Sequence, residues 1–112
     1  MSLAERLREQ RKITVRVDNA TFYARRATIE EFSRYSMDRT LDAEVARLHV
    51  TGWDGVKECD LIDDGSKEVI PFDREAFIEA IGDKPEWFSA IAKQVLDEAI
   101  KRLTSKAENE KK

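Results

Sequence analysis

The sequence predicts an α+β fold, with short strands near the N-terminus and helices after them. Three observations carry this prediction. Residues 13–17 (ITVRV) alternate apolar and polar side chains, which is typical of a strand with one buried face. Apolar residues recur at three- and four-residue spacing between Phe88 and Leu103, which is typical of a long amphipathic helix. Turn and capping residues separate these segments within only 112 residues, so we expect a single domain.

The N-terminal part predicts a polar arm followed by a β-hairpin. Residues 1–12 are charged and lack a core stripe, which favours a frayed helix or a loose segment. The strand at 13–17 and a second run, ATFYAR, are separated by Asp18 and Asn19, which tolerate the backbone angles of a turn. We therefore expect a hairpin over residues 13–26.

Two short helices are expected next. Thr28 and Glu31 have the spacing of a capping box, which predicts a helix that begins there. A second helical segment is expected over residues 40–50, since Leu41 and Val45 fall on one face. Gly52 is well placed to end it.

A second small hairpin is predicted around the acidic turn at residues 63–66. The strand-like runs CDLI and EVIPF flank that turn. Asp73 is expected to cap a helix with the sequence REAFIEAI, which Gly82 ends.

The last element is the long amphipathic helix, with Pro85 in its first turn. Its length of about 20 residues corresponds to roughly 30 Å at 1.5 Å per residue. Its apolar stripe must pack against the domain or against a partner, and a second copy of the chain is one such partner. The domain therefore spans residues 13–104, and the charged residues 105–112 predict a disordered tail.

The residues able to do chemistry do not form a recognisable catalytic or metal-binding motif. His49 is the only histidine, and its apolar neighbours favour a helix-surface or partly packed side chain. Cys59 lies between Glu58 and Asp60 and has no neighbour that would activate a thiol. A calcium loop that begins at Asp60 fails at its third and twelfth positions, which lack ligand oxygens. We therefore predict no enzyme activity, no metal and no cofactor.

Composition excludes further classes of function. No apolar run approaches the roughly 20 residues of a membrane span, and a single cysteine fits a reducing cytoplasm. The net charge of −3 gives a nucleic-acid binder no long-range attraction, so we expect nucleic acid to be an unlikely partner. A small nucleic-acid-binding regulator stays open as a weaker alternative. It would use Arg6, Arg8, Arg11 and Arg25, although no aromatic-interleaved basic platform accompanies them in the sequence.

The order of motifs in the second half resembles a known family. VTGWDGV at residues 50–56 precedes an acidic glycine turn, EVIPFDRE, and a helix after GDKP. This order resembles the tail assembly chaperone and minor tail protein family of long-tailed bacteriophages and prophages, over roughly residues 13–104. The basic N-terminal arm departs from that pattern.

The resemblance implies a non-catalytic chaperone that binds the tape-measure protein and helps to recruit tail-tube subunits. Such proteins act in the cytoplasm of the infected host and are absent from the mature virion, and many have a longer frameshifted form. A structural virion component, such as a minor tail or head–tail joining protein, is the alternative. The large apolar side chains expected to contact a partner are Trp53, Phe72, Trp87, Phe88, Ile91 and Val95.

Overall fold

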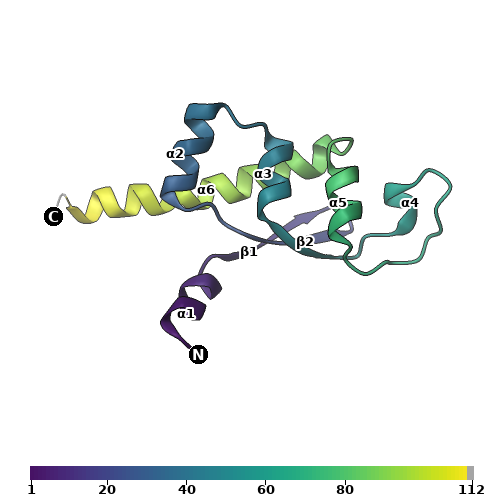
Figure 1. Cartoon of the computed structure of the whole chain (residues 1–112), viewed down its shortest axis with the longest axis horizontal. Helices are drawn as coiled ribbons and strands as arrows, with labels where there is room; N and C mark the ends of the chain where they lie inside the picture. Colours follow the sequence, from purple (N-terminus) through teal and green to yellow (C-terminus); the bar gives the residue numbers. More distant parts are fainter. Residues whose placement is uncertain (111–112) are drawn as a thin grey trace.

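A three-stranded antiparallel sheet lies on one side of the chain and four helices lie on the other, as the computed structural model shows (Figure 1). The structure describes the backbone of residues 1–110 and the side chains through Ser105. The strands β1 (Lys12–Val17), β2 (Ala20–Arg25) and β3 (Val50–Asp54) lie in the order β1-β2-β3. The predicted α+β fold class is confirmed.

The N-terminal hairpin forms as predicted, with Val15 opposite Phe22. β2 also pairs with β3, where Phe22 lies opposite Trp53, and a register shift between Tyr23 and Ala24 interrupts this ladder. Alternation places Phe22 in the core and Tyr23 on the opposite, open face of the sheet. The sheet therefore has one face under the helices and one exposed face.

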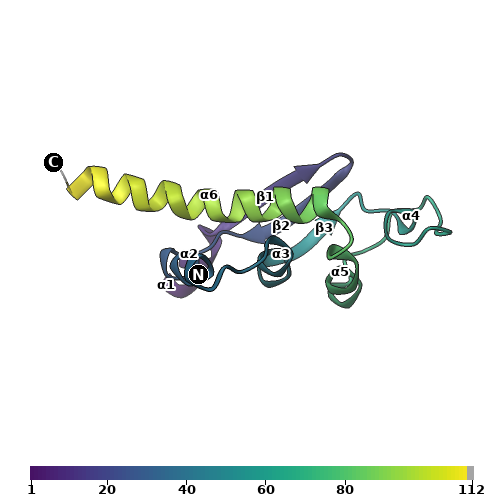
Figure 2. The ribbon, with the colours of Figure 1, turned by 90° about the horizontal axis from the view of Figure 1, so that it is seen from above.

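Four helices build the covered layer: α2 (Ile29–Asp38), α3 (Asp42–His49), α5 (Arg74–Ile81) and α6 (Pro85–Glu110). The capping box of α2 forms as predicted, because Thr28 Oγ1 accepts from the Glu31 amide at 3.1 Å and Glu31 accepts from the Thr28 amide at 3.0 Å. Asp73 caps α5 by accepting from the Ala76 amide at 3.1 Å. α6 runs along the layer and contacts β1, β2 and the other three helices (Figure 2).

The predicted second hairpin is wrong. The run CDLI lies largely in a single helical turn, α4 (Glu58–Leu61), and the run EVIPF forms one isolated bridge, between Val69 and Lys57. Beside this bridge the amides of Glu58 and Ile70 donate to the carbonyls of Glu68 and Val56. A Cβ at Gly65 would lie 2.8 Å from the carbonyl oxygen of Glu58, so the turn packs closely against the start of α4.

The end of α3 also differs from the prediction. The helix ends at His49 and the chain enters β3 at Val50 with no intervening loop, so Gly52 lies within a strand. The predicted helix end at Gly52 is therefore wrong: glycine often follows a helix, but here it lies in the strand that continues directly from α3.

Aromatic rings form the centre of the core. The rings of Phe22 and Trp87 lie 5.0 Å apart, and those of Phe22 and Phe77 lie 6.1 Å apart. Trp53 meets Phe72 at 5.0 Å in an edge-to-face arrangement, and its indole nitrogen donates to the carbonyl of Ile70 at 3.0 Å. The segment around Trp53 thus joins the sheet to α5, α6 and the loop that precedes α5.

Both terminal helices project from the half of the body that carries α2: α6 extends along the long axis and α1 (Leu3–Glu9) hangs away from the sheet (Figure 1). The helix α1 has its own capping box at Ser2 but no buried residue, so the helical alternative holds for the predicted arm. α6 continues through Glu110 and so includes residues that the sequence assigned to a disordered tail. Residues 111 and 112 of that tail lie outside the described residues.

Substitution of Gly55 tests the turn between β3 and α4. Gly55 has a φ of 74°, and a Cβ there would meet the carbonyl oxygen of Asn19. Gly55→Ala is therefore expected to lower the free energy of unfolding by about 1–3 kcal/mol. Gly52→Ala is the control, since its Cβ would lie 3.5 Å from the Tyr23 ring in ordinary contact. Urea unfolding followed by tryptophan fluorescence measures both, and equal losses would contradict the prediction.

Candidate functional site

Four of the six side chains that the sequence proposed for partner binding lie inside the core. Trp53, Trp87, Ile91 and Val95 are buried, so in this conformation they pack against the chain itself. Phe72 and Phe88 remain half-buried and reach the surface. Hydrophobicity and helical spacing identified the stripe of α6 correctly, but they do not distinguish a core face from a partner face. A partner surface at these positions is therefore limited to Phe72 and Phe88.

Phe88 lines an apolar hollow where the start of α3 meets the turn between α5 and α6. The hollow has a volume of about 520 Å³. Its other lining residues are Thr40, Leu41, Asp42, Ala43 and Gly82. Leu41 is 76% exposed at its mouth, and four residues earlier Met37 on α2 is 84% exposed. The hollow is thus a largely apolar surface recess with an exposed leucine at its mouth.

Leu41 also occupies a position that local stability does not favour. It is the N-cap residue of α3 and makes no side-chain hydrogen bond to the helix. Ser, Thr, Asp or Asn at an N-cap stabilises a helix by about 1 kcal/mol relative to an apolar residue. The chain thus exposes a leucine at a place where a polar residue would stabilise the fold, and such exceptions tend to coincide with functional sites.

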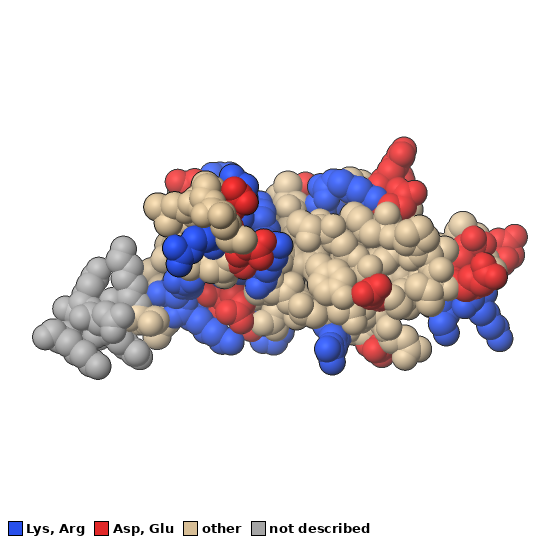
Figure 3. All heavy atoms as spheres, turned by 90° about the horizontal axis from the view of Figure 1, so that it is seen from below, with Lys and Arg blue, Asp and Glu red and all other residues tan. Residues whose placement is uncertain are grey.

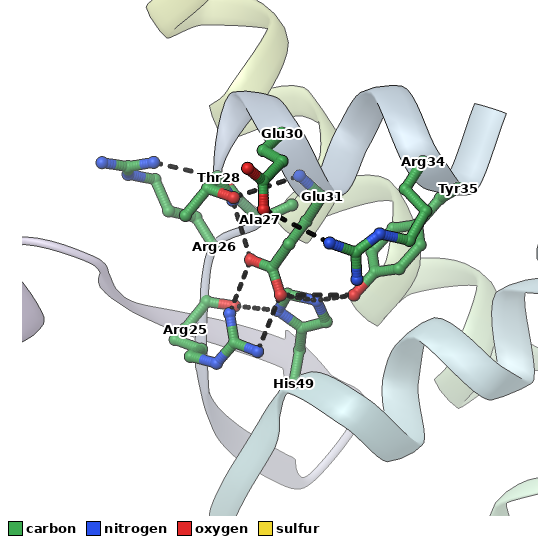
Figure 4. Close-up of polar contacts among 9 residues, drawn as sticks. All are labelled: Arg25, Arg26, Ala27, Thr28, Glu30, Glu31, Arg34, Tyr35 and His49. Atoms are coloured by element: carbon green, nitrogen blue, oxygen red, sulfur yellow. Dashed lines mark hydrogen bonds and ion pairs between the residues drawn. The ribbon is translucent and has the colours of Figure 1, made fainter. Parts of the chain in front are cut away.

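The charged and polar groups gather in a second place, around Glu31 at the start of α2 (Figure 4). Arg25 donates two hydrogen bonds to the Glu31 carboxylate, at 2.8 and 2.9 Å. Burial opposes the ionisation of Glu31, but the hydrogen bonds from Arg25 and Thr28 and the positive charge of Arg25 outweigh it. The pKa of Glu31 is therefore lowered to about 2.

His49 completes this network from the end of α3. Its Nδ1 lies 2.8 Å from the carbonyl oxygen of Arg25 and its Nε2 lies 2.8 Å from the Tyr35 hydroxyl. Because a carbonyl only accepts, Nδ1 carries the proton of the neutral ring, and Nε2 accepts from Tyr35. Burial lowers the pKa of His49, aided by the charge of Arg25. The histidine is wholly buried, so the interpretation of it as a helix-surface or partly packed side chain is wrong.

The geometry of the network supports a structural role. Tyr35 and His49 are buried and Glu31 is 16% exposed, so a substrate has little access to the reactive atoms. Every polar atom named above has a partner within the chain, which is the arrangement that stabilises a buried polar cluster. Cys59 lies apart, half-buried in α4. Within the described part of the chain, no three His, Cys, Asp or Glu side chains gather as metal ligands.

Comparisons with known proteins do not extend this description. No model of a protein family, no curated protein and no solved structure matches the chain. Among residues 1–110, no helix combines the length and the apolar character required to cross a membrane.

The pH dependence of stability tests the network around Glu31 and His49. Below about pH 6.5, His49 becomes protonated in the unfolded chain but stays neutral in the folded chain, where its pKa is lowered. The free energy of unfolding therefore decreases as the pH decreases. A second loss is expected as pH falls from 4.5 towards 2, because folded Glu31 stays ionised to about 2. Urea unfolding at stepped pH values measures both losses.

Glu31→Gln separates the two losses. This variant should lose about 1.5–3 kcal/mol near neutral pH, where the charged hydrogen bonds to Arg25 are removed. It should also lack the Glu31 contribution to the loss below pH 4.5. The control is Glu30→Gln, whose partner Arg34 forms an exposed surface pair at 3.3 Å. An acid profile unchanged by Glu31→Gln would disprove the assignment.

Proposed function

We propose that this chain is a phage tail assembly chaperone that binds an apolar segment of the tape-measure protein in the hollow between Leu41 and Phe88. The bound segment covers both side chains and keeps the tape-measure protein from aggregating before the tail tube forms around it. The chaperone acts by contact and performs no catalysis. This role follows the resemblance of residues 13–104 to that family, and the hollow supplies a recess suited to apolar side chains.

The exposure of Leu41 at an N-cap is the observation that carries the proposal. An apolar residue 76% exposed at the start of a helix does not stabilise the free chain. Covering it with a partner removes apolar surface from water at about 25 cal/mol per Å². The position therefore gains stability only in a complex, which is the property expected of a protein-binding site.

In this proposal the chaperone also recruits tail-tube subunits to the tape-measure protein. It works in the cytoplasm of the host cell and leaves before the virion is complete. The half-buried Phe72 packs edge-to-face on Trp53 and presents one side to solvent, which offers a separate contact for the tail-tube subunit.

Leu41→Asp distinguishes loss of binding from loss of folding. An aspartate at the N-cap is expected to raise the free energy of unfolding of the free chain by about 0.5–2 kcal/mol. The same change places a charge in the apolar hollow, so affinity for a tape-measure fragment should fall at least about tenfold, or 1.4 kcal/mol. Isothermal titration calorimetry and size-exclusion chromatography measure this affinity.

The matched control is Leu48→Asp on the same helix. Leu48 is 46% exposed and lies outside the lining of the hollow. This variant should bind the fragment like the original chain. If Leu41→Asp binds with unchanged affinity, or if no tape-measure fragment binds the original chain, the proposed function is wrong.

A further inference from the structure

We infer that the arginine side chains where α1, β2 and α6 meet bind the phosphates of a single-stranded nucleic acid, and that Tyr23 on the open sheet face stacks on one of its bases. This surface is separate from the hollow at Leu41 and does not depend on the proposed function.

The fold brings together cations that lie far apart in the sequence. Arg8, Arg11, Lys12 and Arg25 line a hollow of about 360 Å³ between α1 and the sheet, with Ala24 and Thr51 at its floor. Arg26 follows Arg25, and its backbone amide donates to the carbonyl of Arg11 at 2.7 Å. Arg102 of α6 is close enough to act electrostatically on Arg26. Figure 3 shows several Lys and Arg side chains, interspersed with Asp and Glu, in the half of the molecule next to the grey residues.

Among the side chains that the structure describes, through Ser105, part of this positive charge has no acidic partner. Arg26 is 8% exposed, and within that part of the chain its side chain donates to the carbonyl of Ala27, at 3.1 Å. Burial lowers the pKa of Arg26, and the charges of Arg102 and Arg11 lower it further, while the charge of Glu98 opposes them. Arg11 is half-buried, and its buried Nε has no hydrogen-bond partner among the described residues. A buried guanidinium beside other cations costs stability unless anions neutralise them.

The acidic side chains at this surface balance only some of the cations. Glu9 pairs with Lys12 at 2.7 Å and Glu31 pairs with Arg25 at 2.8 Å. Glu98 of α6 accepts from Lys101 and Gln94, and its charge also acts favourably on Arg26. Arg8, Arg11, Arg26 and Arg102 form no ion pair with any side chain of residues 1–105. The anion that suits these four therefore carries several charges in a row, as a nucleic-acid backbone does.

The neighbouring surface favours a nucleic acid over an acidic peptide. A second hollow of about 310 Å³ shares Lys12, Ala24 and Thr51 with the first and is completed by Ile13, Thr14 and Tyr23. The Tyr23 ring is 40% exposed on the open face and is held by a hydrogen bond of 2.8 Å to Asp54. An aromatic ring on an open sheet beside a basic groove suits base stacking, whereas an acidic peptide makes no use of it.

Fluorescence anisotropy with a labelled oligothymidine of about 12 nucleotides tests the inference, since sites on small sheet proteins span about 4–16 nucleotides. Saturable binding is expected at low salt. The logarithm of affinity should fall against the logarithm of salt with a slope of about −2 to −3, as for about three or four phosphates. Absence of saturable binding at the lowest salt would overturn the inference.

Variants separate the contributions of charge and stacking. Arg8→Gln with Arg11→Gln should weaken binding about tenfold or more and make the slope shallower by about 1.4. Tyr23→Leu should weaken binding about 5- to 100-fold and leave the slope unchanged. Far-UV circular dichroism checks that each variant is folded, and α1 contributes no buried residue to the core.

The matched control for charge is Arg34→Gln with Lys93→Gln, which removes the same charge from exposed positions on α2 and α6. Its affinity should change less than about twofold at moderate salt, since remote surface charges are largely screened. An equal loss in this control would show non-specific attraction and overturn the inference. Displacement of the oligonucleotide by polyglutamate at equal charge concentration would also overturn it, in favour of an acidic protein partner.

Discussion

The ion pair between Arg25 and Glu31 is the interaction on which the arrangement of the elements depends. Arg25 is the last residue of β2 and Glu31 lies in the first turn of α2, so their two hydrogen bonds fix the angle at which the chain leaves the sheet. The same carboxylate closes the capping box, and the carbonyl of Arg25 orients His49 at the junction of α3 and β3. One buried cluster thus aligns the hairpin, two helices and the third strand.

Much of the fold could be predicted from the sequence, because its signals are local. Alternation in residues 13–17, the Thr28–Glu31 capping box and the Asp73 cap each depend on neighbours within a few residues, and each forms as expected. The two failures have different causes. The run CDLI has strand-like composition but lies largely in the helical turn α4, and one isolated bridge, between Lys57 and Val69, forms beside it. Val50 ends its helix because the distant strand β2 pairs with it.

The proposed binding surfaces were less predictable, because contacts between distant residues create them. A stripe such as Ile91 and Val95 has the same spacing whether it faces a core or a partner. Here α3 and the sheet pack against α6, and the stripe is buried in the core. His49 gave no sign in the sequence that Tyr35 and the carbonyl of Arg25 would enclose it. The four arginines that form no ion pair within residues 1–105 lie up to 94 positions apart along the chain, between Arg8 and Arg102, so only the folded chain brings them to one region.

The contrast between satisfied and unsatisfied groups separates structure from function in this protein. The cluster around Glu31 buries charge, and each group named in it has a hydrogen-bond partner within the chain. A role in stabilising the fold is therefore enough to account for it. Leu41 exposes an apolar side chain where a cap is missing, and Arg11 and Arg26 bury cationic atoms that form no ion pair with the side chains described through Ser105. Neither arrangement stabilises the free chain, and departures of this kind are the ones expected at binding sites. Because one of the two proposed sites is apolar and the other cationic, they would select ligands of different chemistry.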